Sequence, residues 1–157
     1  MSAENNTLRV IIDLMTEADL AEIVLIEHES FPAPWTRGMF INEMENPGSQ
    51  CLCARVDLGS KTVVAAYIIF WIVPGEAHLF SLAVKKEFRR QNLAFNLLKI
   101  MEEIVRKAGI KSITLEVRES NIEAIKLYEK RGFVVKGRRI NYYRETNEDA
   151  LIMWLDI

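Results

Sequence analysis

Two residues in the second half of the chain carry groups that could move protons. Glu116 stands between Leu115 and Val117 in a strand that otherwise reads as buried, and a buried acid costs stability unless it has a partner or a role. Tyr128 lies on the helix that follows, where its phenol could donate a proton to a leaving thiolate. Residue type and spacing alone leave two alternatives open, a glutamate on a solvated edge strand and a tyrosine in an amphipathic core.

A basic loop between an apolar strand and a long helix is a candidate site for an anion. The loop spans 84–94 and contains Lys85, Lys86, Arg89 and Arg90. Free backbone N–H groups and the helix dipole favour phosphate at such a position, although a solvated basic loop has the same composition. Because the loop contains neither glycine nor a Lys-Ser/Thr pair, it is not the phosphate loop of nucleotide triphosphatases.

The histidines and cysteines indicate neither a metal site nor an acetyl-enzyme intermediate. His28 and His78 have no partners at the spacing of metal ligands. Cys51 and Cys53 lie two residues apart in an apolar stretch, a spacing that suits neither a structural disulfide nor a complete zinc site. We therefore expect no metal and two buried, unreactive thiols.

Hydrophobic periodicity predicts the elements that must position these residues. The expected strands are 8–14, 51–57, 62–73, 78–84, 113–117, 133–143 and 150–156. The expected helices are 17–31, 36–46, 92–109 and 121–131. This order predicts a mixed α/β or α+β sheet with helices on its faces.

The overall composition is that of one globular domain over residues 1–157, with half of the residues hydrophobic and 27% charged. A formal net charge of −2 provides no electrostatic footprint for nucleic acid or an anionic membrane. No apolar run approaches the roughly 20 residues that span a bilayer, and residues 1–8 lack the apolar segment of a signal peptide. We expect a cytoplasmic protein that binds neither nucleic acid nor membrane directly.

The basic loop also resembles a known coenzyme-binding signature. The run RRQNLA at 89–94 is similar to the R/Q-x-x-G-x-G/A motif of the GNAT superfamily, in which backbone amides hold the pyrophosphate of coenzyme A. Asn92 stands where the family usually has glycine. Asparagine is the least costly substitute if the backbone is left-handed there, but its side chain could cap the helix and compete for the same N–H groups. The resemblance implies acetyl-CoA as the acetyl donor, and the residues expected to contact it are Leu82, Ala83, Val84, Arg89, Arg90, Gln91, Asn92, Leu93, Ala94, Phe95 and Asn121.

A second and longer run, LEVRESNIEAIKLYEKRGF at 115–133, is similar to the GNAT enzymes that acetylate protein N-termini, especially the RimI group. The resemblance implies a mixed, mostly antiparallel sheet of about seven strands with about four helices on its faces. It also implies strands that part around Leu82 to admit the thioester. The matching positions make Glu116 the general base, Tyr128 the general acid and Asn121 a contact to the coenzyme.

Two further segments resemble those that flank the acceptor peptide in the same group, FPAPW at 31–35 and RRINYY at 138–143. By residue type alone, the aromatic residues of these segments could instead cover the core, and Arg138 and Arg139 could form a solvated edge. The residues that the resemblance places at the acceptor are Phe31, Pro34, Trp35, Asn141 and Tyr142.

The resemblance implies direct transfer of acetyl to a protein N-terminal α-amine, with the N-terminal alanine of a small-subunit ribosomal protein as the expected acceptor. The expected oligomeric state is a monomer or a weak dimer. An N-terminal amine suits direct transfer, because its pKa of about 8 lies well below the value of about 10.4 for a lysine amine. Two alternatives stay open, a GNAT enzyme that acetylates a small-molecule amine and a catalytically weak coenzyme A-binding interaction module.

Overall fold

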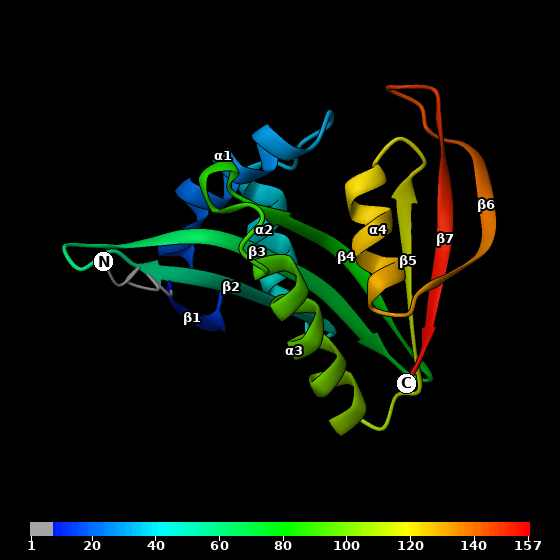
Figure 1. The fold of residues 1–157 in the computed structure, drawn as a ribbon, viewed down its shortest axis with the longest axis horizontal. Helices are drawn as coiled ribbons and strands as arrows, with labels where there is room; N and C mark the ends of the chain where they lie inside the picture. The colour runs from blue at the N-terminus through cyan, green and yellow to red at the C-terminus, as the bar shows by residue number, and fades with distance from the viewer. Residues whose placement is uncertain (1–7) are drawn as a thin grey trace, which may run out of the picture.

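One seven-stranded sheet organises the computed structural model, which describes residues 8–157 (Figure 1). The strand order is β1-β2-β3-β4-β5-β7-β6, and every neighbouring pair is antiparallel except β4 and β5. The strands are β1 (Arg9–Leu14), β2 (Ser49–Asp57), β3 (Thr62–Val73), β4 (Glu76–Val84), β5 (Ser112–Arg118), β6 (Val134–Tyr143) and β7 (Glu148–Asp156). The expected mixed, mostly antiparallel sheet is therefore confirmed.

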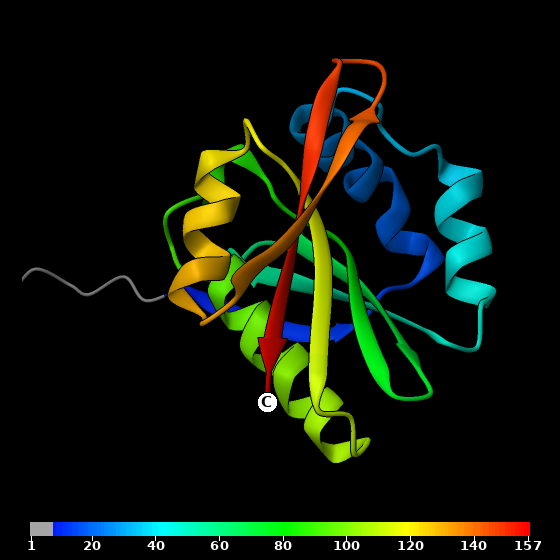
Figure 2. The same ribbon diagram turned by 90° about the vertical axis from the view of Figure 1, so that its right-hand side faces the viewer.

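Helices cover both faces of this sheet (Figure 2). Buried residues of α3 and α4 share one hydrophobic core with the sheet, and those of α1 and α2 share a second core on the opposite face. The helices are α1 (Leu20–Ser30), α2 (Arg37–Glu45), α3 (Leu93–Lys107) and α4 (Ile122–Lys130). Short 3-10 turns at Glu17–Asp19 and Lys86–Phe88 precede α1 and α3. The first expected helix is thus divided into a 3-10 turn and α1.

Alternation along β3 explains how one strand serves both cores. Ala66, Ile68 and Phe70 belong to the core under α3, whereas Tyr67 and Ile69 belong to the core under α1. Successive side chains of a strand point to opposite faces, so a strand covered on both sides reads as one continuous apolar run. That run is what predicted the strand.

The parallel ladder between β4 and β5 is short. It pairs Ala77 with Ile113, His78 with Thr114 and Leu79 with Leu115, and then ends although β4 continues to Val84 and β5 to Arg118. Figure 1 shows the two strands diverging beyond this point. The divergence leaves backbone groups of both strands facing a gap inside the sheet.

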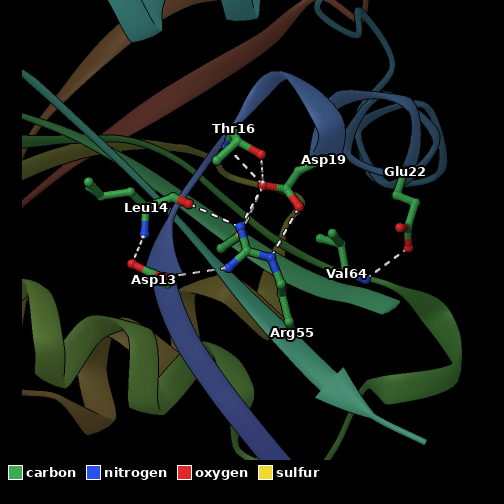
Figure 3. A network of polar contacts seen from close by, with 8 residues as sticks. Asp13, Leu14, Thr16, Asp19, Glu22, Arg55 and Val64 are labelled. Carbon is green, nitrogen blue, oxygen red and sulfur yellow. Dashed lines mark hydrogen bonds and ion pairs between the residues drawn. The ribbon is translucent and has the colours of Figure 1, made fainter. Parts of the chain in front are cut away.

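An ion pair fixes the start of the first helical segment to the sheet (Figure 3). Asp19 accepts hydrogen bonds from Arg55 Nη2 at 2.6 Å, from Arg55 Nε at 3.1 Å and from the backbone N–H of Thr16 at 2.8 Å. Burial alone would raise the pKa of Asp19, but the hydrogen bonds from Arg55 and Thr16 outweigh burial and lower it. The contact ties the start of this helical segment to β2, and the helix that follows, α1, packs on β3 and β4.

Both cysteines are buried free thiols, as expected. Burial raises the pKa of Cys53 to about 12, and the nearby carboxylate of Asp19 acts in the same direction. Within residues 8–157, no helix has the length and apolar character needed to cross a membrane.

Candidate active site

A cavity of about 240 Å³ lies where β4 and β5 diverge. Its walls come from α1, the segment 31–35, β4, β5, α4 and the turn between β6 and β7. Six of the residues predicted from the sequence line it together: Phe31, Trp35, Leu82, Glu116, Asn121 and Tyr128. The predicted base, the predicted acid and part of the predicted acceptor wall therefore meet in one place.

Glu116 reaches the cavity from an interior strand. β5 lies between β4 and β7, so the alternative of an edge-strand glutamate is wrong. The side chain is 18% exposed, and Arg139 Nε lies 3.0 Å from its Oε1. Burial raises the pKa of Tyr142, and the nearby charge of Glu116 acts in the same direction. The carboxylate is thus paired with Arg139 of β6.

Tyr128 enters the cavity from α4. The residue is buried, and its ring centroid lies 5.7 Å from that of Phe133 in the core under α3. Burial raises the pKa of Tyr128 above its ordinary value of 10, so its hydroxyl stays protonated at neutral pH. A protonated phenol that faces a cavity can serve as a proton donor. Both interpretations of this residue are therefore compatible, because it packs in the core and opens onto the cavity.

The basic loop lies between the end of β4 and the start of α3. Asn92 is left-handed, with φ 63° and ψ 18°, and Arg90 also has φ 63°. Asn92 precedes α3 without a capping hydrogen bond from its side chain, so it does not compete for the first N–H groups of the helix. Those groups, at Leu93 and the residues after it, have no carbonyl partner within the helix. The conformation is the one that glycine would adopt in this position.

The exposed side chain of Arg89 makes two polar contacts that tie the loop to neighbouring elements. Its Nε donates to the carbonyl of Val84 at 3.0 Å, and its Nη2 lies 3.5 Å from Ser30 Oγ. At the other side of the cavity, Asn121 caps α4 by accepting a hydrogen bond from the N–H of Ala124 at 3.3 Å. The helix expected over 121–131 is confirmed, with Asn121 as its N-cap.

The predicted acceptor residues are only partly brought together. Among the described residues, Pro34, Asn141 and Tyr142 lie outside the set that lines the cavity. Asn141 is left-handed at φ 53°, and its N–H donates to Asp149 Oδ1 at 2.7 Å. The pairing of β6 with β7 is interrupted between Arg139 and Tyr143, the stretch that contains Asn141. Tyr142 lies near enough to Glu116 for the charge of that carboxylate to raise the pKa of the phenol.

Several residues of the cavity were missed by the sequence analysis. Tyr143 lines it, with the guanidinium of Arg118 4.0 Å from its ring centroid, and burial raises the pKa of Tyr143 to about 12. Phe80 lines it from a bulge in β4 and lies 5.4 Å from the Trp35 ring. The tyrosine pair at 142–143 was a usable signal for Tyr143. Glu27 also lines the cavity. Its position along the expected helix did not distinguish it from a surface glutamate.

Comparison with known proteins identifies close relatives. The family model described as Acetyltransferase (GNAT) family matches residues 20–133. A Bacillus subtilis protein, provisionally named ribosomal protein bS18-alanine N-acetyltransferase, is 38% identical over 88% of this chain and 90% of its own length. The Escherichia coli K12 ribosomal protein bS18-alanine N-acetyltransferase is 36% identical over 93% of this chain and 97% of its own length. The crystal structure of the Escherichia coli S18-alanine enzyme matches with a TM-score of 0.83 at 33% identity, covering 95% of this chain and 94% of that one.

Proposed function

The chain belongs to the GNAT acetyltransferase family and is an N-acetyltransferase, and we propose that its acceptor is the N-terminal alanine of a ribosomal protein of the bS18 type. The observation that carries this proposal is the cavity between β4 and β5, into which Glu116 and Tyr128 both open. The relatives named above act, by their names, on the alanine of bS18, and they match nearly the whole chain.

The residues present fit acetyl-CoA as the donor. The left-handed turn at Asn92 leaves the first N–H groups of α3 free of side-chain competition, and Lys85, Lys86 and Arg90 supply positive charge beside them. Beyond Leu79, the backbone of β4 is no longer paired with β5. When bound, acetyl-CoA supplies the acetyl group and releases coenzyme A as a thiol. The start of α3 would hold the pyrophosphate, and residues 82–84 would present main-chain groups to the rest of the molecule.

The proton transfers are assigned to the two cavity residues. Glu116, directly or through a water molecule, first takes a proton from the incoming ammonium and passes it to solvent, and then takes the second proton that the neutral amine loses as its nitrogen attacks the acetyl carbonyl. Tyr128 donates its phenolic proton to the departing sulfur. Glu116 then releases a proton to solvent, and the phenolate of Tyr128 takes one up from solvent. A backbone N–H of the unpaired part of β4 would meet the oxyanion.

Arg139 is paired with the proposed base before the acceptor arrives. The guanidinium of Arg139 forms an ion pair with the Glu116 carboxylate. A protonated α-amine that enters the cavity carries the same positive charge and could take the place of the guanidinium. Exchange of one cation for the other would bring the ammonium to the group that deprotonates it. The acceptor's own charge is therefore used in its recognition.

Mass spectrometry of acetylated products tests the proposal. An alanine-starting peptide, the same peptide blocked at its N-terminus and carrying a lysine, and a panel of free amines would be incubated with the protein and acetyl-CoA at equal concentrations. The expected result is acetylation of the alanine α-amine above the other acceptors. Faster reaction of a free amine would indicate a small-molecule enzyme, and no turnover of any acceptor would indicate a binding module.

A further inference from the structure

Glu27 is a buried carboxylate at the cavity that the proton transfers above do not use. It lies in the last turns of α1, is 4% exposed and lines the same cavity as Glu116. Burial raises the pKa of Glu27, although hydrogen bonds from Tyr67 and from the backbone of Trp35 favour its charged form. Burying a carboxylate is costly, so its hydrogen bonds indicate what it holds in place.

Both carboxylate oxygens are engaged, and the partners lie on different elements. Oε1 accepts the backbone N–H of Trp35 at 3.1 Å. Oε2 accepts the hydroxyl of Tyr67, which lies on β3 in the core under α1. The Tyr67 hydroxyl also lies 3.4 Å from Ser81 Oγ on β4. One side chain thus links the segment after α1 to two strands of the sheet.

Glu27 holds the segment 31–35 at both ends. Its carbonyl accepts the N–H of Phe31 at 3.0 Å, as the last hydrogen bond of α1, and its side chain accepts the N–H of Trp35. Pro32 and Pro34 have no N–H to offer, so few backbone donors are left to fix this segment. Phe31 and Trp35, at the two ends, are the residues of the segment that the sequence analysis placed at the acceptor and that line the cavity.

We propose that Glu27 is a positioning residue that fixes the acceptor wall, by tying the Trp35 end of segment 31–35 to β3 through Tyr67. The proposal deepens the proposed function and rests on it in one respect, because the segment is an acceptor wall only if a peptide binds there. Both oxygens of the carboxylate are already engaged by Trp35 and Tyr67, so the role assigned to it is one of positioning. Its effect passes through the position of the Trp35 backbone, and so through the width of the cavity opposite Glu116.

Glu22 provides a matched control on the same helix. Its Oε2 also accepts a backbone N–H, that of Val64 on β3, at 2.8 Å (Figure 3). Unlike the side chain of Glu27, the side chain of Glu22 is bonded to β3 and not to the segment 31–35. A leucine at either position removes a carboxylate that accepts a backbone N–H. Only the change at 27 should alter the acceptor wall.

The test compares Glu27→Leu, Glu27→Gln, Tyr67→Phe and Glu22→Leu in the full chain. In Glu27→Leu we expect the KM for the alanine-starting peptide to rise about tenfold or more, since the lost hydrogen bond involves a charged group. The dissociation constant of acetyl-CoA, measured by calorimetry, should stay within about twofold, because the change displaces the acceptor wall and leaves the start of α3 in place. Glu27→Gln should restore most of the peptide KM, since its amide oxygen can still accept the Trp35 N–H. Glu22→Leu should leave the peptide KM unchanged.

Amide hydrogen exchange at Trp35 supplies a readout that does not depend on activity. We expect exchange of the Trp35 N–H, followed by NMR, to accelerate in Glu27→Leu, to accelerate less in Tyr67→Phe and to be unchanged in Glu22→Leu. Unchanged exchange in Glu27→Leu would overturn the proposal whatever the protein acetylates. If Glu27→Leu does not fold, equal exchange in wild type and Tyr67→Phe would overturn it instead. A wild-type protein that acetylates no peptide would refute the proposed function alone, because the exchange comparison could still be made.

Discussion

Replacement of Asn92 by glycine tests whether the turn before α3 serves as a left-handed turn or as a side-chain ligand. A left-handed residue with a Cβ costs roughly 1–2 kcal/mol, and asparagine pays the least of the non-glycine residues. Glycine removes that cost but loses about 0.5–1 kcal/mol through the greater freedom of its unfolded chain. The two terms nearly cancel at φ 63°, so we expect the free energy of unfolding of Asn92→Gly to stay within about 1 kcal/mol of wild type.

Arg90 is the matched comparison, because it has the same φ of 63° but a side chain with no preference for the left-handed region. Arg90→Gly should therefore raise the free energy of unfolding, measured by urea denaturation, by up to about 1 kcal/mol and by at least as much as Asn92→Gly does. Acetyl-CoA affinity, measured by calorimetry, should be unchanged or higher in Asn92→Gly, because the side chain makes no capping hydrogen bond. A large loss of affinity in a folded Asn92→Gly protein would refute this reasoning and make the asparagine side chain a ligand.

Three further predictions concern other contacts of the structure. Glu116→Gln and Tyr128→Phe should each lower kcat by about 100-fold or more in steady-state assays while acetyl-CoA affinity in calorimetry stays near wild type, and wild-type rates for both would refute their roles. Arg131→Met should lower the free energy of unfolding in urea by about 2–3 kcal/mol, because Glu102, 3% exposed, loses charged hydrogen bonds of 2.7 and 2.8 Å and keeps only the 3.7 Å contact with Arg106. A loss below about 1 kcal/mol would contradict this. Asp19 has a lowered pKa, so its stabilisation is complete above the ordinary value of 3.8 and is lost as pH falls through the lowered pKa. The thermal unfolding midpoint of wild type should therefore lie above that of Asp19→Asn at neutral pH, and the two midpoints should converge in acid. A difference between the midpoints that does not change with pH would refute the assignment.

The parts of the fold that depend on local pattern could be predicted from the sequence. The apolar run of β3 and the amphipathic pattern of α3 predicted those elements, because each covers a core directly. Thr36 was expected to start a helix, and its side chain accepts the N–H of Met39 at 3.4 Å. Strand ends were predicted less well, since β7 starts at Glu148 rather than at 150 and β4 at Glu76 rather than at 78. Polar residues at these ends pair through their backbones, which leaves no hydrophobic signal.

The candidate site was predicted only where a motif marked it. Glu116 and Tyr128 carried such a motif, whereas Glu27 depends on a partner 40 residues away, Tyr67, and on the path of a proline-containing segment. Phe80 reaches the cavity because β4 has a bulge opposite Ile69 and Phe70 of β3, and a bulge has no hydrophobic periodicity of its own. Contacts that need two distant segments to arrive together are therefore the part that the sequence alone does not reveal.

The short ladder between β4 and β5 makes the molecule modular. The segment 31–35 and the basic loop belong to the part of the sheet formed by β1 to β4. The proposed base, Glu116, belongs to the part formed by β5, β6 and β7, and three residue pairs join the two parts. The turn between Tyr143 and Glu148 lies outside both cores. It can therefore be lengthened at little cost to folding where the contacts of Glu145 and Thr146 with Arg118 are kept, because long surface loops add only slowly to the entropy of closure. New acceptors could be sought by grafting such turns from relatives, with the donor half of the protein left untouched.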